Sequence, residues 1–294
     1  VETDTTLLLA LEAQKRNYEI IWYETKDLSL IKSKVFVDGK NIKFFDETKR
    51  FFKVKKNIKF DLSKAKVILV RQNPPFNMDY INSTYYLDKI KKLVKVINDP
   101  TAIRDISEKF YSSKFIKYMP PTIFTRDILL IYKFYKKYKK IVIKPTNGYA
   151  GKGILFLNNN FNKKKIFNYL NTIGHVMVQK YISGIKKGDK RIFIINGKVM
   201  GAIKRVPQKN SILSNISQGG VAVKTKLNTK ERNIAKVIAK DLIKNNIFFS
   251  GIDLVSGYLI GDINVTSPTG LRQYKDLTKI NLAEKFWDNL FKLK

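Results

Sequence analysis

Hydrophobic and polar residues alternate along the first 120 positions with two periods, one typical of helices and one typical of strands. Leu7, Leu8 and Leu11 share one helix face, and VILV is a continuous apolar run that predicts a buried strand. The predicted elements of this part are helices at 5–16, 79–92 and 101–117, strands at 18–23, 67–70 and 94–97, and a turn between short strands at Asp38 and Gly39. This alternation is typical of a layered α/β protein.

After Pro120 and Pro121, which predict a boundary, the pattern favours antiparallel strands. The clearest prediction is a hairpin over 191–206, because Asn196 and Gly197 tolerate positive φ and separate two strand-like runs. The other predicted elements are strands at 141–144, 154–157, 176–182, 247–255 and 258–264, helices at 163–172, 228–245 and 279–292, and a polar loop at 207–220.

Composition adds a strong positive charge. The 294 residues include 57 Lys and Arg against 24 Asp and Glu, a net charge of +33. A nucleic-acid partner is one interpretation, and segment 49–60, KRFFKVKKNIKF, is its best candidate. However, nine of the basic residues are arginine and 48 are lysine, whereas phosphate-binding surfaces favour arginine. We therefore expect no specific nucleic-acid partner, and a sheet-edge strand protected by lysines explains segment 49–60 equally well.

Several classes of protein are excluded. The chain has no cysteine, so a disulfide scaffold, a thiolate metal site and a cysteine nucleophile are ruled out, and a single His rules out a histidine-rich metal site. A hydrophobic content of 44% argues against disorder. The acidic start does not resemble a signal peptide, and no segment is long and apolar enough to cross a membrane. We expect a globular cytoplasmic protein without a membrane partner.

Two segments carry candidate chemistry. KPTNGYAGKG, residues 144–153, places a lysine at a strand end before three glycines, which allow backbone amides to approach phosphate oxygens. It is not a P-loop, because the G-K-[ST] ending is missing, and a plain hairpin turn remains an alternative. Further along, Asp262 and Asn264 project from one face of a strand near Asp253. Such oxygen ligands suit Mg²⁺, although a hairpin with solvated polar residues explains them too.

In their order these elements resemble the parts of ATP-grasp ligases, and the chain is similar to bacterial glutathione synthetases over nearly its whole length. The resemblance rests on the stretches LEAQKRNYEI, RQNPPFNMDYINSTYYL, NDPTAIRDISEK, KPTNGYAGKG, KGDKRIFIINGKV, RVPQ and DINVTSPTGLR. It implies an α/β protein with an amino-terminal open parallel sheet domain, lacking the family's first strand, over 1–105. A two-lobed ATP-grasp α+β domain would follow over 106–294, with lobes at about 106–182 and 183–294.

The resemblance also implies roles for individual residues. Arg191 and Arg205 would neutralise the transferring phosphate and the acyl-phosphate, and Asp253, Asp262 and Asn264 would hold Mg²⁺, with Mn²⁺ as an alternative. The residues implied for ATP are Lys109, Lys144, Gly148, Tyr149, Ala150, Gly151, Gln179, Tyr181, Ile182 and Asp189. The candidates for the peptide and glycine site are Arg71, Asn98, Ser267, Thr269, Gly270 and Arg272.

The implied activity is the ATP-dependent joining of γ-glutamylcysteine and glycine, with ATP as co-substrate and a homotetramer as the assembly. The sequence departs from the family at Asp262, where a Glu is usual, at Leu213, where the lid loop usually carries an Arg, and at Ala150, where a Gly is usual. These departures leave two alternatives open, a weakened or truncated ATP-grasp protein that binds nucleotide, and a related peptide ligase with another acceptor.

Overall fold

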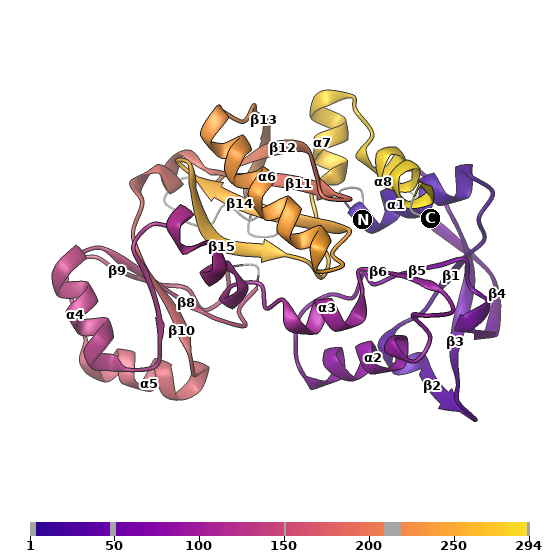
Figure 1. Ribbon diagram of the computed structural model, residues 1–294, viewed down its shortest axis with the longest axis horizontal. Coiled ribbons are helices and arrows are strands. Elements are labelled where there is room, and N and C mark those ends of the chain that lie inside the picture. The colour runs from indigo at the N-terminus through magenta and orange to yellow at the C-terminus, as the bar shows by residue number, and fades with distance from the viewer. Residues whose placement is uncertain (1–3, 48–50, 150, 209–218, 293–294) are drawn as a thin grey trace.

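The computed structural model describes residues 4–47, 51–149, 151–208 and 219–292. These residues form three parts, which lie at the right, at the left and in the upper centre of Figure 1. Ala150 and Leu213, singled out above, lie outside the described residues. No helix in the described ranges is long and apolar enough to span a membrane.

The first part combines an antiparallel sheet with a parallel pair of strands. Its strand β3 pairs with β1 and β2 along one edge and with β4 along the other, and β5 runs parallel to β6. The elements are α1 (Thr5–Lys15), β1 (Ile20–Trp22), η1 (Thr25–Asp27), β2 (Leu28–Ile31), β3 (Lys34–Phe44), β4 (Phe52–Asp61), η2 (Leu62–Lys64), β5 (Val67–Leu69), α2 (Met78–Asp88), β6 (Lys95–Ile97) and α3 (Pro100–Asp105). Parallel pairing, expected for the whole sheet, is therefore confined to β5 and β6 among the described strands.

The turn predicted at Asp38 and Gly39 is wrong. Both residues lie inside β3, and the chain turns instead at Lys32 and Ser33, which have φ values of 46° and 65°. Gly39 has a packing role, because a Cβ added there would lie 2.9 Å from a methyl group of Ile21 on β1. The glycine thus permits close approach of two strands rather than a turn.

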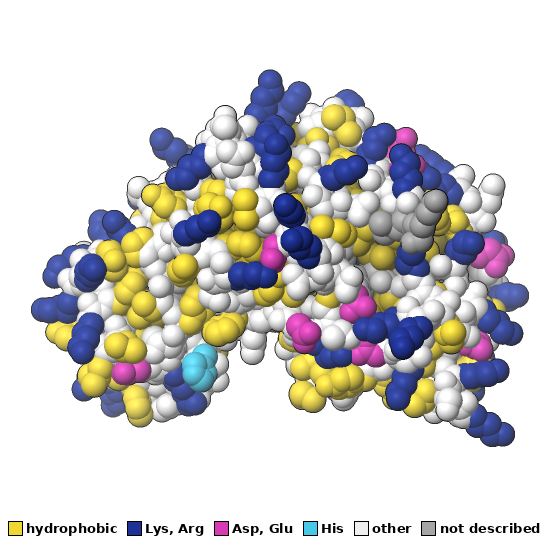
Figure 2. All heavy atoms as spheres, viewed as in Figure 1, with side chains coloured by type: hydrophobic (Ala, Val, Ile, Leu, Met, Phe, Trp, Pro, Cys, Tyr) yellow, Lys and Arg dark blue, Asp and Glu magenta, His cyan; other side chains and the backbone are white. Residues whose placement is uncertain are grey.

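The described residues of segment 49–60, considered above as a nucleic-acid candidate, lie mostly in β4 at the edge of this sheet, and residues 49 and 50 lie outside the described ranges. Most side chains of β4 are exposed, as expected for an edge strand protected by lysines. Figure 2 shows Lys and Arg side chains spread over the whole visible face rather than gathered above these strands.

The second part is a small antiparallel sheet of order β7-β10-β8-β9, covered by two helices. Its elements are β7 (Thr122–Thr125), α4 (Ile128–Tyr138), β8 (Ile141–Pro145), β9 (Leu155–Leu157), α5 (Lys163–Ile173) and β10 (Val176–Lys180). Ile131, Ile141 and Ile166 form its buried core. The glycine loop joins β8 to β9, as predicted.

The third part is a five-stranded antiparallel sheet of order β13-β12-β11-β14-β15. Asn196 and Gly197, with φ values of 49° and 68°, form the predicted hairpin turn between β11 and β12. The elements are η4 (Ser183–Lys187), β11 (Asp189–Ile195), β12 (Lys198–Val206), β13 (Val221–Lys224), α6 (Thr229–Lys244), β14 (Phe249–Val255), β15 (Tyr258–Asn264), α7 (Leu271–Thr278) and α8 (Leu282–Phe291). Apolar side chains of α6 pack on Ile192, Ile194 and Ile252.

One predicted helix is divided, and one helix was not predicted. The helix expected over 101–117 is replaced by α3 and the 3₁₀ helix η3 (Phe110–Tyr118), because the carbonyl of Glu108 accepts the N–H of Ile263 on β15 instead of continuing a helix. The helix expected over 279–292 corresponds to α8, whereas α7, which ends at Thr278, lies before the predicted range. Lys279 ends α7 in a left-handed conformation, and the side chain of Asn281 caps the start of α8.

The two ends of the chain pack together. Leu8, Leu9 and Ala13 of α1 share a buried cluster with Phe286 and Trp287 of α8. The Trp287 indole N–H donates to the carbonyl of Leu9 at 3.0 Å. Figure 1 shows both labelled termini beside these two helices. The first part is thereby packed against the third, since the same cluster includes Phe193 of β11 and Ile203 of β12.

We expect Asp88→Asn to flatten the acid dependence of stability. Asp88 binds Arg104, Lys91 at 3.1 Å and the Thr101 hydroxyl at 2.9 Å. Burial raises the pKa of Asp88, but these partners outweigh it and hold that pKa below the ordinary value of 3.8. The stabilisation is therefore complete above pH 3.8 and is lost as pH falls through the lower folded-state pKa. Urea unfolding at about pH 5 and about pH 3 should show a smaller loss in the variant than in the wild type; equal losses would contradict this.

Candidate active site

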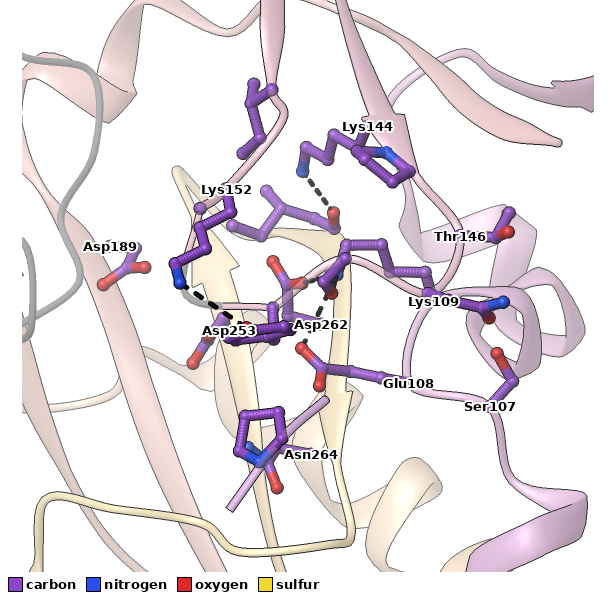
Figure 3. A pocket seen from close by; sticks show the side chains of 18 of the residues that line it. Ser107, Glu108, Lys109, Lys144, Thr146, Lys152, Asp189, Asp253, Asp262 and Asn264 are labelled. Carbon is purple, nitrogen blue, oxygen red and sulfur yellow. Dashed lines mark hydrogen bonds and ion pairs between the residues drawn. The ribbon is translucent and has the colours of Figure 1, made fainter. Parts of the chain in front are cut away.

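A cavity of about 670 Å³ lies where the three parts meet. It is lined by strands of the second part and of the five-stranded sheet of the third part, together with the glycine loop and segments of the first part. Figure 3 shows that the labelled lysines and carboxylates approach one another from different elements. A cavity of this size, with convergent charged groups, is typical of a small-molecule site.

Strand register brings four charged residues together on the large sheet. Asp189 on β11 stands opposite Arg205 on β12, and Arg191 on β11 stands opposite Asp253 on β14. Asp189 and Arg191 are two residues apart, so both project from the same face of β11. Gly251 provides room for this arrangement, because a Cβ there would lie 2.9 Å from Cδ of Arg191.

These four residues form a continuous chain of ion pairs. Arg191 binds both oxygens of Asp253, at 2.5 and 2.8 Å, and Arg205 binds Asp189 and Asp253. Asp253 is 3% exposed. Burial alone would raise the pKa of Asp253, but the two guanidinium groups hold it below its usual range. The two arginines are thus held in fixed positions at the cavity wall.

Lys109 connects the glycine loop to β15. Its ammonium donates to the carbonyl of Gly148 at 2.5 Å and lies 3.2 Å from Asp262 and 3.7 Å from Glu108. Burial would raise the pKa of Asp262, but Lys109 and Lys144 lower it to about 2. Glu108 differs, because burial outweighs the charge of Lys109 and raises its pKa to about 7.

Lys144 at the end of β8 has neutral partners. It donates to the carbonyl of Ile260 at 2.7 Å and to Oε1 of Gln179 at 3.3 Å. Its side chain is buried, and burial lowers its pKa. A buried ammonium with neutral partners favours the approach of an anionic ligand.

An apolar region adjoins these charges. The rings of Phe156 and Tyr181 lie 4.6 Å apart, and Tyr181, Ile182 and Val142 line the cavity. Nε2 of Gln179 donates to the Thr122 hydroxyl at 3.0 Å, so its side chain is held within the protein. This region offers an aromatic and aliphatic surface to a flat ring.

Most of the predicted site residues meet in this cavity. Those that line it are Lys109, Lys144, Gly148, Tyr149, Gly151, Gln179, Tyr181, Ile182, Asp189, Arg191, Arg205, Asp253, Asp262, Asn264, Ser267 and Thr269. Ala150 lies outside the described residues.

Four predicted substrate residues do not line the cavity. The Asn98 amide is occupied by backbone groups of Phe248, Phe249 and Val265, so it joins the first part to β14 rather than facing a ligand. Arg272 pairs with Asp46. The N–H of Gly270 binds the hydroxyl of Thr5.

Arg71 is the fourth of these residues, and it supports the cavity wall from behind. Nη2 of Arg71 donates to the carbonyl of Pro268, which lies between the two lining residues Ser267 and Thr269. The geometry therefore does not favour direct contact with substrate for these four residues, Arg71, Asn98, Gly270 and Arg272.

Sequence reasoning missed several residues of the wall. Glu108 lies beside Lys109 and Asp262, and its only signal in the sequence was its place next to a predicted ATP-binding lysine. Phe76 and Tyr80 line the wall that the first part contributes. Tyr80 lies in the stretch RQNPPFNMDYINSTYYL, which carries part of the resemblance, but no residue of it after Arg71 was singled out.

The donor set fits a hard cation such as Mg²⁺. Asp262 and Asn264 lie two residues apart on β15 and both line the cavity, offering a carboxylate and an amide. Both oxygens of Asp253 are bound by arginines. In the described part of the chain no group of three or more His, Cys, Asp or Glu residues is placed to hold a metal. A magnesium site here would therefore depend on the amide oxygen of Asn264, and Mg²⁺ accepts oxygen ligands of this type.

Solved structures with a similar fold are ATP-grasp ligases. The ligase PsnB complexed with a minimal precursor has a TM-score of 0.67 and 15% identity, covering 97% of this chain and 93% of that one. The D-alanine–D-alanine ligase from Bacillus anthracis has a TM-score of 0.53 and 15% identity, covering 71% and 73%. At this identity the likeness concerns the fold.

Sequence comparisons give the family. The chain matches family models for the N-terminal domain of prokaryotic glutathione synthetase over residues 1–104 and for its ATP-grasp domain over residues 108–279. The glutathione synthetase of Mesorhizobium japonicum is 37% identical over 290 residues, covering 97% of this chain and 92% of that protein. That of Buchnera aphidicola subsp. Baizongia pistaciae is 36% identical over 298 residues, covering 99% and 92%. The chain therefore belongs to the prokaryotic glutathione synthetase family.

Proposed function

We propose that the cavity binds ATP, γ-glutamylcysteine and glycine and joins the last two into glutathione. The single observation that carries this proposal is the convergence of Lys109, Lys144, Arg191 and Arg205 on one cavity of a chain in this family. Four cations around one space suit a nucleoside triphosphate and a phosphorylated intermediate. The chain is an ATP-dependent ligase, as its homologues indicate.

For the nucleotide, we assign the phosphates to Lys109, Lys144 and the glycine loop. Lys144 already faces neutral partners, and Lys109 holds the Gly148 carbonyl, so a bound phosphate would join an existing set of contacts. The adenine would lie against Tyr181 and Ile182, and Asp189 would lie towards the ribose.

In the proposed reaction, the cysteinyl carboxylate attacks the γ-phosphorus of ATP and ADP leaves. The amine of glycine then attacks the acyl-phosphate carbon, and inorganic phosphate leaves as the new amide forms. Arg191 and Arg205 are placed to neutralise the charge of the transferring group, because Asp189 and Asp253 fix their orientation. No protein nucleophile is needed, since positioning and charge neutralisation suffice for phosphoryl transfer.

We propose Mg²⁺ as the metal, held by Asp262 and Asn264. Asp253 joins this set only if its arginines pair with phosphate instead. The ion would supply charge neutralisation at the phosphate oxygens. We further propose a cytoplasmic location. We also propose a homotetramer, and light scattering of the purified protein would test this assembly.

The alternatives of a weakened protein and of another acceptor are not favoured, because identity to glutathione synthetases extends along nearly the whole chain. Asp262, one methylene shorter than the usual Glu, still lies in the cavity beside Lys109.

Phosphate release from ATP and Mg²⁺ should require both γ-glutamylcysteine and glycine. The measurement omits each in turn and identifies the tripeptide product by mass spectrometry. Because the amine attacks only after the carboxylate is activated, omission of either substrate should stop sustained turnover. Replacing glycine with alanine or serine is the control for acceptor choice. Equal turnover without the dipeptide, or ATP binding without turnover, would contradict the proposal.

A further inference from the structure

One wall of the cavity has polar groups that the reaction described above does not use. Tyr80, in the first turn of α2, lines the cavity and is 1% exposed. Among the described residues, its hydroxyl has no hydrogen-bond partner. A buried hydroxyl without a partner is costly, so it calls for an acceptor supplied from outside the chain.

A second unpaired donor lies near Tyr80. Nη1 of Arg71 is buried and has no partner among the described residues, while Nε and Nη2 bind the hydroxyl of Thr6 and the carbonyl of Pro268. The guanidinium also lies 5.9 Å from the ring centroid of Phe249. These partners are neutral or aromatic. The charge of Asp4 acts on the guanidinium, but no carboxylate among the described residues forms an ion pair with it.

The surroundings favour an anion with an aliphatic body. The rings of Phe76 and Tyr80 lie 4.9 Å apart, and Phe76 and Pro74 also line the cavity. Apolar surface of this kind suits the side-chain methylene groups of the glutamyl residue, whereas glycine has no side chain. Burial raises the pKa of Tyr80, so the phenol remains protonated and able to donate.

We propose that the hydroxyl of Tyr80 donates a hydrogen bond to a carboxylate of the γ-glutamyl dipeptide, with the charge of Arg71 behind it. This inference rests on the proposed function and adds the position of the dipeptide, on the wall made by the first part. Arg71 acts through its charge and through the carbonyl of Pro268, as a positioning residue.

Tyr80→Phe tests the proposal, because it removes one hydroxyl and keeps the ring. Calorimetric titration with γ-glutamyl-2-aminobutyrate, a dipeptide without a thiol, should show at least about tenfold weaker binding, the usual effect of losing a hydrogen bond to a charged group. ATP affinity should be unchanged. The thermal midpoint without ligand should be equal or higher, since a hydroxyl without a partner is removed.

Tyr85→Phe is the matched control, because Tyr85 lies on the same helix and is 52% exposed. Dipeptide affinity of Tyr80→Phe within twofold of the wild type would overturn the proposal. So would a tenfold rise in the KM for glycine with that for the dipeptide unchanged. Wild-type protein that binds ATP but not the dipeptide would overturn the proposed function itself, which separates the two failures.

Discussion

Replacing Lys144 with methionine should lower kcat/KM for ATP by about two to three orders of magnitude, the range seen when one charge-stabilising donor is removed from an active site. Lys144 is buried at the end of β8 and its partners are the carbonyl of Ile260 and Gln179. Methionine keeps the length of the side chain and removes the charge. We expect little change in stability, because losing one hydrogen bond is offset by relief of a buried charge.

Initial rates at varied ATP concentration, together with thermal unfolding, check this prediction. Lys187→Met is the control, since Lys187 is exposed in η4 and does not line the cavity. A Lys144→Met enzyme within about threefold of the wild type would contradict an ATP-binding role, because one lost charge contact should exceed that factor. A large fall in thermal midpoint would instead indicate that Lys144 acts through the fold.

Replacing Asp253 with asparagine should reduce the free energy of unfolding by about 3–5 kcal/mol, the cost of leaving a buried charge without its partner. Asp253 contacts both Arg191 and Arg205, and all three side chains are buried. The variant leaves Arg191 without its carboxylate. Activity should fall as well, because the arginines lose the group that orients them.

Urea unfolding measured at neutral pH checks the predicted loss of stability. Glu24→Gln is the control, because Glu24 forms an exposed ion pair with Lys26 at 2.8 Å and should not change stability measurably. Unfolding curves for Asp253→Asn that coincide with the wild type would show that the ion-pair chain contributes nothing to the fold.

Some features of the site are local and were predictable from residue order. Asp262 and Asn264 share a face because successive side chains in a strand alternate. Asn196 and Gly197 form a turn because they tolerate positive φ. Lys144 was a candidate because it stands at a strand end before three glycines, whereas the role of Lys109 came only from resemblance to a family.

Other predictions failed because packing outweighed a local signal. Gly39 has the composition of a turn, but it lies within β3 because close contact with Ile21 needs a residue without a side chain. The segment after Asp105 has helical periodicity, but the carbonyl of Glu108 is bound by β15 and the helix ends. Both outcomes depend on strands far away in the sequence.

The sequence by itself determined the class of fold, most secondary elements and, through the resemblance that its motifs carry, most of the charged residues of the cavity. Tertiary structure alone decided which groups are paired. Strand register sets Asp253 opposite Arg191. Packing between distant segments places Asn98 against the backbone of β14 and leaves the Tyr80 hydroxyl without a partner among the described residues. The physical reason is that pairing and burial arise between segments distant along the chain, so neither residue type nor periodicity encodes them locally.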